Sequence, residues 1–154
     1  GTFLTNHDQD RSFTVFGEDE GRARVAAGIY LTLPGVPFLY YGEEIGMTGS
    51  GAHEFIRSPM QWDGTPLVGF TTGSPWQAIN ANADRFNVQD ESGDPASLLS
   101  WYRRLIATRN ASPALRRGTH AAIGVSDPPI FAFARSDGAQ IVSTLSNTPA
   151  SPTN

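Results

Sequence analysis

Residues 36–41, Val-Pro-Phe-Leu-Tyr-Tyr, form a continuous apolar run with no alternation of polar and apolar side chains. A strand with one face in water alternates, whereas a parallel strand that is covered on both faces does not. Gly42 ends the run before the acidic pair Glu43-Glu44. The run therefore predicts a strand of a parallel sheet that is buried on both faces.

The segment before this run has the pattern of an amphipathic helix. Val25, Ile29 and Leu33 recur at four-residue spacing, and Pro34-Gly35 ends the pattern. Such a stripe is typical of a helix with one buried face. Thr2–Thr5 is a short strand-like run upstream of it. Residues 2–41 are therefore predicted to form a strand, a helix and a second strand in a βαβ unit.

Polar residues follow both predicted strands. Asn6-His7-Asp8 comes after the first strand, and Glu43-Glu44 comes after the second. In parallel α/β folds the chemistry lies at the carboxyl ends of the strands, so these residues are candidates for a site. Residues 45–96 then form a long irregular stretch, whose aromatic side chains and Arg57 favour an ordered, packed loop.

A second helix is predicted after this loop. Asp94-Pro95 is expected to begin it, as N-cap and first-turn proline, and it should run to about Arg109. Its predicted buried face consists of Leu98, Leu99, Tyr102, Leu105 and Ile106. The periodicity then changes, and a domain boundary is expected near residues 112–118.

Short strands are predicted beyond that boundary. They cover residues 119–125, 130–135 and 141–145. Asp137-Gly138 between the last two is a typical hairpin turn, because both residues tolerate the backbone angles that tight hairpins require. The end of the chain is therefore expected to be antiparallel.

Composition excludes several classes of function. The 11 basic and 15 acidic side chains leave a net charge of −4, which argues against a nucleic-acid binder with a basic face for phosphates. The absence of cysteine removes disulfides, thiolate nucleophiles and thiolate-bound zinc. No stretch approaches the ~20 uninterrupted apolar residues of a spanning helix. No metal-ligand spacing is present.

Each candidate motif also has an ordinary structural explanation. Asn6-His7-Asp8 can cap a turn. The segment Arg57-Ser58-Pro59-Met60-Gln61-Trp62-Asp63 can be a packed surface loop with an ion pair. On spacing alone, Glu43-Glu44 only marks the end of a strand. A chemical interpretation therefore depends on whether the motifs belong together.

Taken in order, the motifs resemble the α-amylase family of glycoside hydrolases. Phe3–Asp8 resembles the family's strand-seven motif, and Gly35–Met47 resembles its strand-eight segment. Three further segments are similar to the oligo-1,6-glucosidase and neopullulanase-like branches: Ile56–Asp63, Gly69–Trp76 and Asp94–Ile106. The resemblance is specific up to about Gly118 and loose in the strands beyond.

The resemblance implies an α/β fold, with the last strands and helices of a (β/α)8 TIM barrel followed by the start of an antiparallel β-sandwich domain. Residues 1–112 would hold strand seven, helix seven, strand eight, a long loop and helix eight. Residues 113–154 would begin the C-terminal β domain. Because most strands and helices of the barrel would be missing from this sequence, about 300 residues or more are expected to precede Gly1.

The implied activity of the full-length protein is retaining hydrolysis of α-glucosidic bonds in starch-derived oligosaccharides. Two carboxyl groups about 5 Å apart perform this reaction, and the family places both upstream of residue 1. By motif position Asp8 is a third carboxylate, which stabilises the transition state by binding the sugar hydroxyls at C2 and C3. This chain by itself is therefore expected to be inactive.

The resemblance also implies supporting roles. His7 would bind the same hydroxyls and orient Asp8. Arg57 would bind substrate and close the end of the sugar pocket, paired with an acid outside this sequence. Asn6 and Arg11 would support these side chains without touching the sugar.

Other residues near these motifs are expected to be structural. Trp62 should pack within its loop, and His53 should be a solvated loop residue. Glu43 and Glu44 are not expected to be catalytic. No cofactor is expected in this chain, although the resemblance allows calcium in the full-length protein.

Two alternative functions remain open at this point. A trehalose-forming isomerase or another transglycosylase of the family would share these motifs, and so would a non-catalytic carbohydrate-binding homologue. The expected partner is an α-glucan oligosaccharide, with no nucleic acid and no membrane span. The sequence leaves open the linkage preference, endo or exo action, oligomeric state and localisation.

Overall fold

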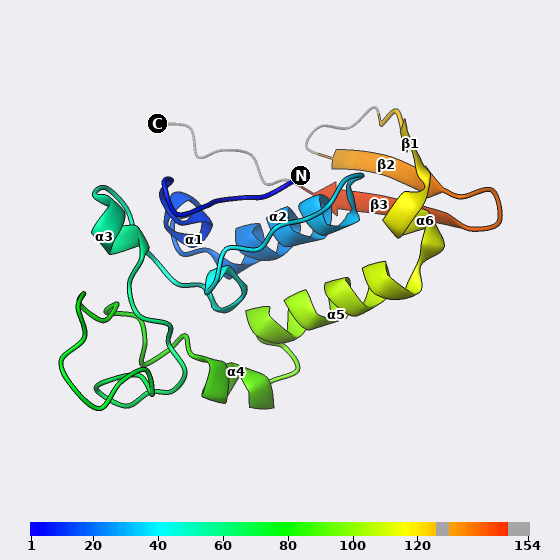
Figure 1. Ribbon diagram of the computed structural model, residues 1–154. Coiled ribbons are helices and arrows are strands. Elements are labelled where there is room, and N and C mark those ends of the chain that lie inside the picture. Colours follow the sequence, from blue (N-terminus) through cyan, green and yellow to red (C-terminus); the bar gives the residue numbers. More distant parts are fainter. Residues whose placement is uncertain (126–129, 148–154) are drawn as a thin grey trace.

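The computed structural model describes residues 1–125 and 130–147. Two long helices, α2 (Glu20–Thr32) and α5 (Leu98–Ala111), lie side by side, with a small sheet at one end and a long loop at the other (Figure 1). The other elements are short: α1 (Ser12–Val15), the 3-10 helix η1 (Glu43–Ile45), α3 (His53–Ile56), α4 (Val88–Gly93), α6 (Pro113–Arg117), β1 (Thr119–Ala122), β2 (Ile130–Ser136) and β3 (Ile141–Asn147).

Helix α2 (Glu20–Thr32) ends close to the predicted stop at Pro34-Gly35 but buries a different face. Asp19 is its N-cap, and the Asp19 carboxylate accepts a hydrogen bond of 3.1 Å from the backbone N–H of Arg22. The helix ends at Thr32, just before the Leu33-Pro34 pair. The predicted stripe at Val25, Ile29 and Leu33 is only half-buried. The residues that are buried instead are Ala23, Ala27, Tyr30, Leu31 and Thr32.

Helix α5 begins later than predicted. Asp94 forms a turn, in which its carboxylate accepts from the backbone N–H of Ala96. The N-cap is Ser97, whose hydroxyl accepts a hydrogen bond of 3.1 Å from the backbone N–H of Ser100. The predicted buried face is too wide, because Leu105 is only partly buried and Ile106 is exposed. The buried apolar residues of α5 are Leu98, Leu99 and Tyr102.

The two predicted strands of the βαβ unit are reduced to one parallel bridge between Thr2 and Pro37. The backbone N–H of Thr2 donates to the carbonyl of Val36 at 2.9 Å, and that of Phe38 donates to the carbonyl of Thr2 at 2.8 Å. The parallel direction agrees with the prediction. The predicted burial on both faces disagrees with the structure, because Val36 and Phe38 are 64% and 60% exposed. Within the described chain each segment pairs along one edge only, so neither is enclosed as a central parallel strand would be.

The three strands form an antiparallel sheet in the order β1-β2-β3. The predicted hairpin at Asp137-Gly138 is confirmed: the Asp137 carboxylate accepts a hydrogen bond of 2.9 Å from the backbone N–H of Gln140. Strand β1 ends at Ala122, earlier than predicted. Arg135 of β2 joins the sheet to α2 by donating to the carbonyl of Thr32 at 2.9 Å.

The larger architecture of the C-terminal region stays a prediction. This sheet alone tests neither the predicted second sheet of a sandwich nor the predicted domain limits, residues 1–112 and 113–154. Residues 126–129 and 148–154 of that predicted domain lie outside the described residues.

The core has two parts: the larger joins the two long helices, and the smaller packs η1 and the long loop against α5. The larger cluster consists of Phe13, Ala23, Ala27, Tyr30, Leu31, Phe86, Leu98 and Tyr102. The smaller one consists of Ile45, Met47, Met60 and Leu99. Because Met47 and Met60 are loop residues, the prediction that residues 45–96 pack as an ordered loop is confirmed. No helix in residues 1–125 and 130–147 is long and apolar enough to cross a membrane.

Candidate functional site

Asp8 lies in a turn directly after the Thr2–Thr5 segment. The side-chain oxygen of Asn6 accepts a hydrogen bond of 2.8 Å from the backbone N–H of Asp8, which is an Asx turn. The buried hydroxyl of Thr5 donates to the carbonyl of Asp10 at 2.9 Å and closes the same turn. The backbone is thus fixed by local hydrogen bonds, while the Asp8 side chain is 54% exposed. The carboxylate is therefore held in place and open to a ligand.

Three cationic or potentially cationic side chains surround this carboxylate. Arg57 Nη2 donates to Asp8 Oδ1 at 3.1 Å. His7 Nε2 lies 3.2 Å from Oδ2, and His53 Nδ1 lies 3.4 Å from Oδ1. Arg57 Nε also donates to the backbone carbonyl of His7 at 3.2 Å. The fold therefore brings together all three residues predicted to act directly on the sugar, although they are separated by up to 50 positions in the sequence.

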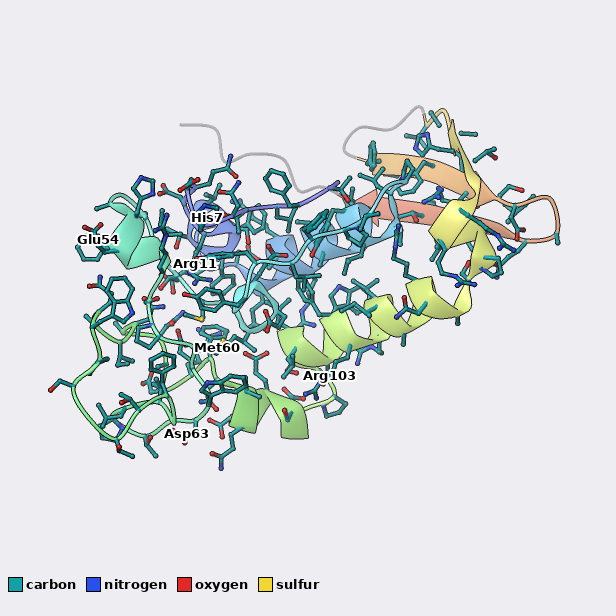
Figure 2. The ribbon with its side chains drawn as sticks, in the orientation of Figure 1. His7, Arg11, Glu54, Met60, Asp63 and Arg103 are labelled. Atoms are coloured by element: carbon teal, nitrogen blue, oxygen red, sulfur yellow. The ribbon has the colours of Figure 1, made fainter. Side chains whose placement is uncertain are left out.

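Two details of this cluster differ from the expectations. Arg57 pairs with Asp8 itself, whereas the expected partner is an acid outside the sequence. His53 is exposed, as expected, but α3 places it against the carboxylate of Asp8. No pattern in the sequence indicated this position for His53. His7 and Arg11 lie near α3, at the end of the molecule remote from the sheet (Figure 2).

Arg11 connects two loops behind this cluster. It is 1% exposed, its Nε donates to the carbonyl of Ile56 at 2.9 Å, and its Nη1 donates to the carbonyl of Tyr41 at 2.7 Å. The guanidinium carbon lies 4.7 Å from the ring centroids of both Tyr40 and Tyr41, which are cation–π distances. Because Ile56 directly precedes Arg57, Arg11 is placed to fix the backbone that carries Arg57.

We expect Arg11→Leu to lower the free energy of unfolding by about 3 kcal/mol, because two carbonyls lose a charged donor inside the protein. Urea unfolding followed by circular dichroism measures this change. Arg116→Leu is the control, since Arg116 is an exposed arginine of α6. Equal midpoints for the two variants would show that Arg11 does not hold the loops.

Glu43, which follows the apolar run 36–41, contacts the core rather than the Asp8 cluster. Glu43 Oε1 accepts hydrogen bonds from the hydroxyls of Tyr30, at 3.0 Å, and Tyr102, at 2.9 Å. It thereby links η1 to both long helices. Burial raises the pKa of Glu43 to about 7, against the opposing effect of these hydrogen bonds. These contacts agree with the structural role expected for Glu43.

Trp62 does not pack within its loop as expected. It is 50% exposed and lines a pocket of about 450 Å³ that Arg57 also lines. As for metals, no group of three or more His, Asp or Glu side chains among the described residues is arranged to hold an ion.

Comparison with known proteins identifies relatives for nearly the whole chain. A family model described as "Alpha amylase, catalytic domain" matches residues 1–118. "Probable oligo-1,6-glucosidase 2" of Bacillus subtilis is 28% identical, with 94% of this chain and 33% of that protein aligned. The α-amylase from H. orenii is 43% identical with a TM-score of 0.81, over 94% of this chain and 29% of that one.

A solved synthase is equally similar in fold. The trehalulose synthase MutB from Pseudomonas mesoacidophila MX-45 is 31% identical with a TM-score of 0.86, over 95% of this chain and 34% of that one. The chain thus spans about a third of the length of the relatives that it matches. Since the family model covers most of the sequence and the folds agree, this chain belongs to the α-amylase family.

Proposed function

We propose that the full-length protein carrying this sequence is a retaining α-glucan hydrolase, of the α-amylase or α-glucosidase type, in which Asp8 stabilises the transition state. The observation that carries the proposal is the position of the Asp8 carboxylate, half-exposed and within 3.1–3.4 Å of nitrogen atoms of His7, His53 and Arg57. Family membership supports the reaction class. The two carboxyl groups that attack the anomeric carbon and protonate the leaving oxygen would come from outside residues 1–154.

Asp8 would act through hydrogen bonds and charge, without giving or taking a proton. A carboxylate that accepts hydrogen bonds from two neighbouring sugar hydroxyls holds the ring as it flattens. Its negative charge also favours the positive charge that develops on the ring. His7 can donate to one of the same hydroxyls from a ring nitrogen.

The contacts of Asp8 determine how a sugar could enter. An ionised carboxylate offers about four acceptor positions, and side chains of three residues already face Asp8. A sugar with two hydroxyls to place must therefore displace at least one of them. His53 and His7 are the candidates, because their side chains are 62% and 61% exposed and can move at small cost.

A transglycosylase is the second candidate, and the similarity to trehalulose synthase favours it. Asp8 would serve it in the same way, because hydrolysis and glycosyl transfer pass through the same cationic ring. The two reactions differ only in whether water or a sugar hydroxyl accepts the glucosyl group.

Product analysis tests the proposal. We expect the full-length protein to release glucose from maltose or isomaltose, measured by chromatography of the reaction mixture over time. A new disaccharide appearing in place of free glucose would make the transglycosylase the better assignment. Unchanged maltose, isomaltose and longer maltooligosaccharides would indicate the non-catalytic, carbohydrate-binding homologue.

A further inference from the structure

The loop that carries α3 is closed at its base. This α3 loop comprises residues 49–57, and Arg57 is its last residue. Gly49 lies directly against the far end of the loop, since a Cβ at Gly49 would collide with the carbonyl oxygen of Phe55. Only a residue without a side chain allows this close approach. The α3 loop is therefore a compact unit, and its position depends on the contacts that hold it from outside.

Arg11 and Thr14 hold the base of the α3 loop. The backbone N–H of Arg11 donates to the carbonyl of Gly49 at 2.9 Å, and the N–H of Gly49 donates to the hydroxyl of Thr14 at 2.9 Å. At the other end of the loop, Arg11 Nε donates to the carbonyl of Ile56 at 2.9 Å. Thr14 belongs to α1, which lies beside α3 (Figure 1). The base is therefore fixed to the segment that follows Asp8 in the sequence.

Asp10 holds the outer part of the loop, next to the start of α3. Asp10 Oδ1 accepts a hydrogen bond of 2.9 Å from the backbone N–H of Gly51. Gly51 has a φ of 82° and lies two residues before α3 begins at His53, so its backbone sets the direction in which the chain enters α3. The hydroxyl of Thr5 ties the carbonyl of Asp10 into the turn that carries Asp8. Asp10 therefore joins α3 to that turn.

The position of α3 decides which side chains meet Asp8. His53 is the first residue of α3 and Arg57 directly follows its last, so the two are four positions apart and face the same side of the helix. Their nitrogen atoms contact the same oxygen: Arg57 Nη2 lies 3.1 Å and His53 Nδ1 lies 3.4 Å from Asp8 Oδ1. A shift of α3 would therefore change both contacts together.

We propose that Asp10 is a positioning residue, which holds α3 through Gly51 so that His53 and Arg57 meet Asp8. A helix of four residues has too few internal hydrogen bonds to fix its own position, so α3 depends on such external contacts. Asp10 acts through the α3 loop and does not itself touch the sugar. This inference rests on the proposed function for the importance of Asp8 in the reaction.

Hydrogen–deuterium exchange of the full-length protein, followed by mass spectrometry, tests the contact itself. Asp10→Ala should raise the exchange rate of peptides that cover residues 49–57 about tenfold, because Gly51 loses its acceptor and the loop opens more often. Asp10→Asn keeps a side-chain oxygen that can accept from Gly51, and it should exchange as the unaltered protein does. Asp94→Ala is the control, since the Asp94 carboxylate also accepts from a backbone N–H, that of Ala96 at 2.7 Å. It should leave the exchange of residues 49–57 unchanged.

Kinetics show whether the position of the loop matters for the reaction. Asp10→Ala should lower kcat/KM for maltose or isomaltose about tenfold, because the groups that face Asp8 are displaced. Asp10→Asn should restore the value of the unaltered protein. Since Asp10 acts through α3, Asp10→Ala should have little further effect in a protein that already carries His53→Ala and Arg57→Ala. A purely structural role would give the same loss in both backgrounds.

The outcomes separate this inference from the proposed function. Unchanged exchange of residues 49–57 in the Asp10→Ala protein would overturn the inference. A full tenfold loss that persists without the His53 and Arg57 side chains would also overturn it, as would normal kcat/KM in an Asp10→Ala protein whose loop exchanges faster. If the unaltered full-length protein acts on neither maltose nor isomaltose, the proposed function fails, while faster exchange in Asp10→Ala still supports the contact between Asp10 and the α3 loop.

Discussion

Replacing Asp8 with Asn is expected to lower kcat/KM for maltose or isomaltose by about 100- to 1,000-fold in the full-length protein. That is the usual loss when one group that stabilises transition-state charge is removed. Asn retains the size of Asp and can still hydrogen-bond a sugar hydroxyl, but it lacks the negative charge opposite the cationic ring. We therefore expect most of the loss in kcat and little change in KM. Initial rates over a range of substrate concentrations separate the two parameters.

Asp84→Asn is the matched control for this experiment, because it makes the same chemical change at an exposed carboxylate of the long loop. It should keep the kinetic parameters of the unaltered protein. Circular dichroism spectra of both variants establish that the fold is retained. An Asp8→Asn protein with full kcat would rule out transition-state stabilisation by this residue.

The Asp8 cluster shows what a sequence can and cannot predict about a site. The resemblance to the α-amylase family implied that His7, Asp8 and Arg57 act together, and the structure places them in contact. His53 was missed because a histidine in a glycine-rich loop carries no periodic signal. Only the short helix α3 brings it to Asp8. Contacts between loops depend on tertiary packing, which hydrophobic patterns do not encode.

The helices and strands also include features that the sequence predicts and features that it does not. The hairpin at Asp137-Gly138 and the end of α2 just before Leu33-Pro34 follow from local turn and proline chemistry, which the sequence contains. The burial of residues 36–41 does not follow from local chemistry, because it depends on neighbouring segments along both edges of the strand. Within the described chain the Pro37 segment is bridged along one edge only, so Val36 and Phe38 remain exposed. A buried pattern therefore predicts the environment of a segment only when all its neighbours are present.

Stability should fall as pH rises from about 5 to 7, because of carboxyl groups buried in the core. Burial raises the pKa values of Glu43 and Glu91 from 4.5 to about 7. Between these values the folded protein holds protons that the unfolded chain has released, so deprotonation favours unfolding. The stabilisation present near pH 4.5 is thus lost as pH approaches the folded-state pKa. Urea unfolding at several pH values measures this dependence.

Glu43→Gln should make the fall in the free energy of unfolding with rising pH less steep, by up to about 1.4 kcal/mol per pH unit, because one titrating group is removed. The amide oxygen of Gln can still accept hydrogen bonds from the hydroxyls of Tyr30 and Tyr102, so the junction between α2 and α5 is kept. Glu54→Gln is the control, since Glu54 is an exposed residue of α3. If Glu43→Gln and the unaltered protein lose stability with the same slope, Glu43 does not retain its proton in the folded state. The two tyrosine hydroxyls would then be donating to a carboxylate that is charged throughout this pH range.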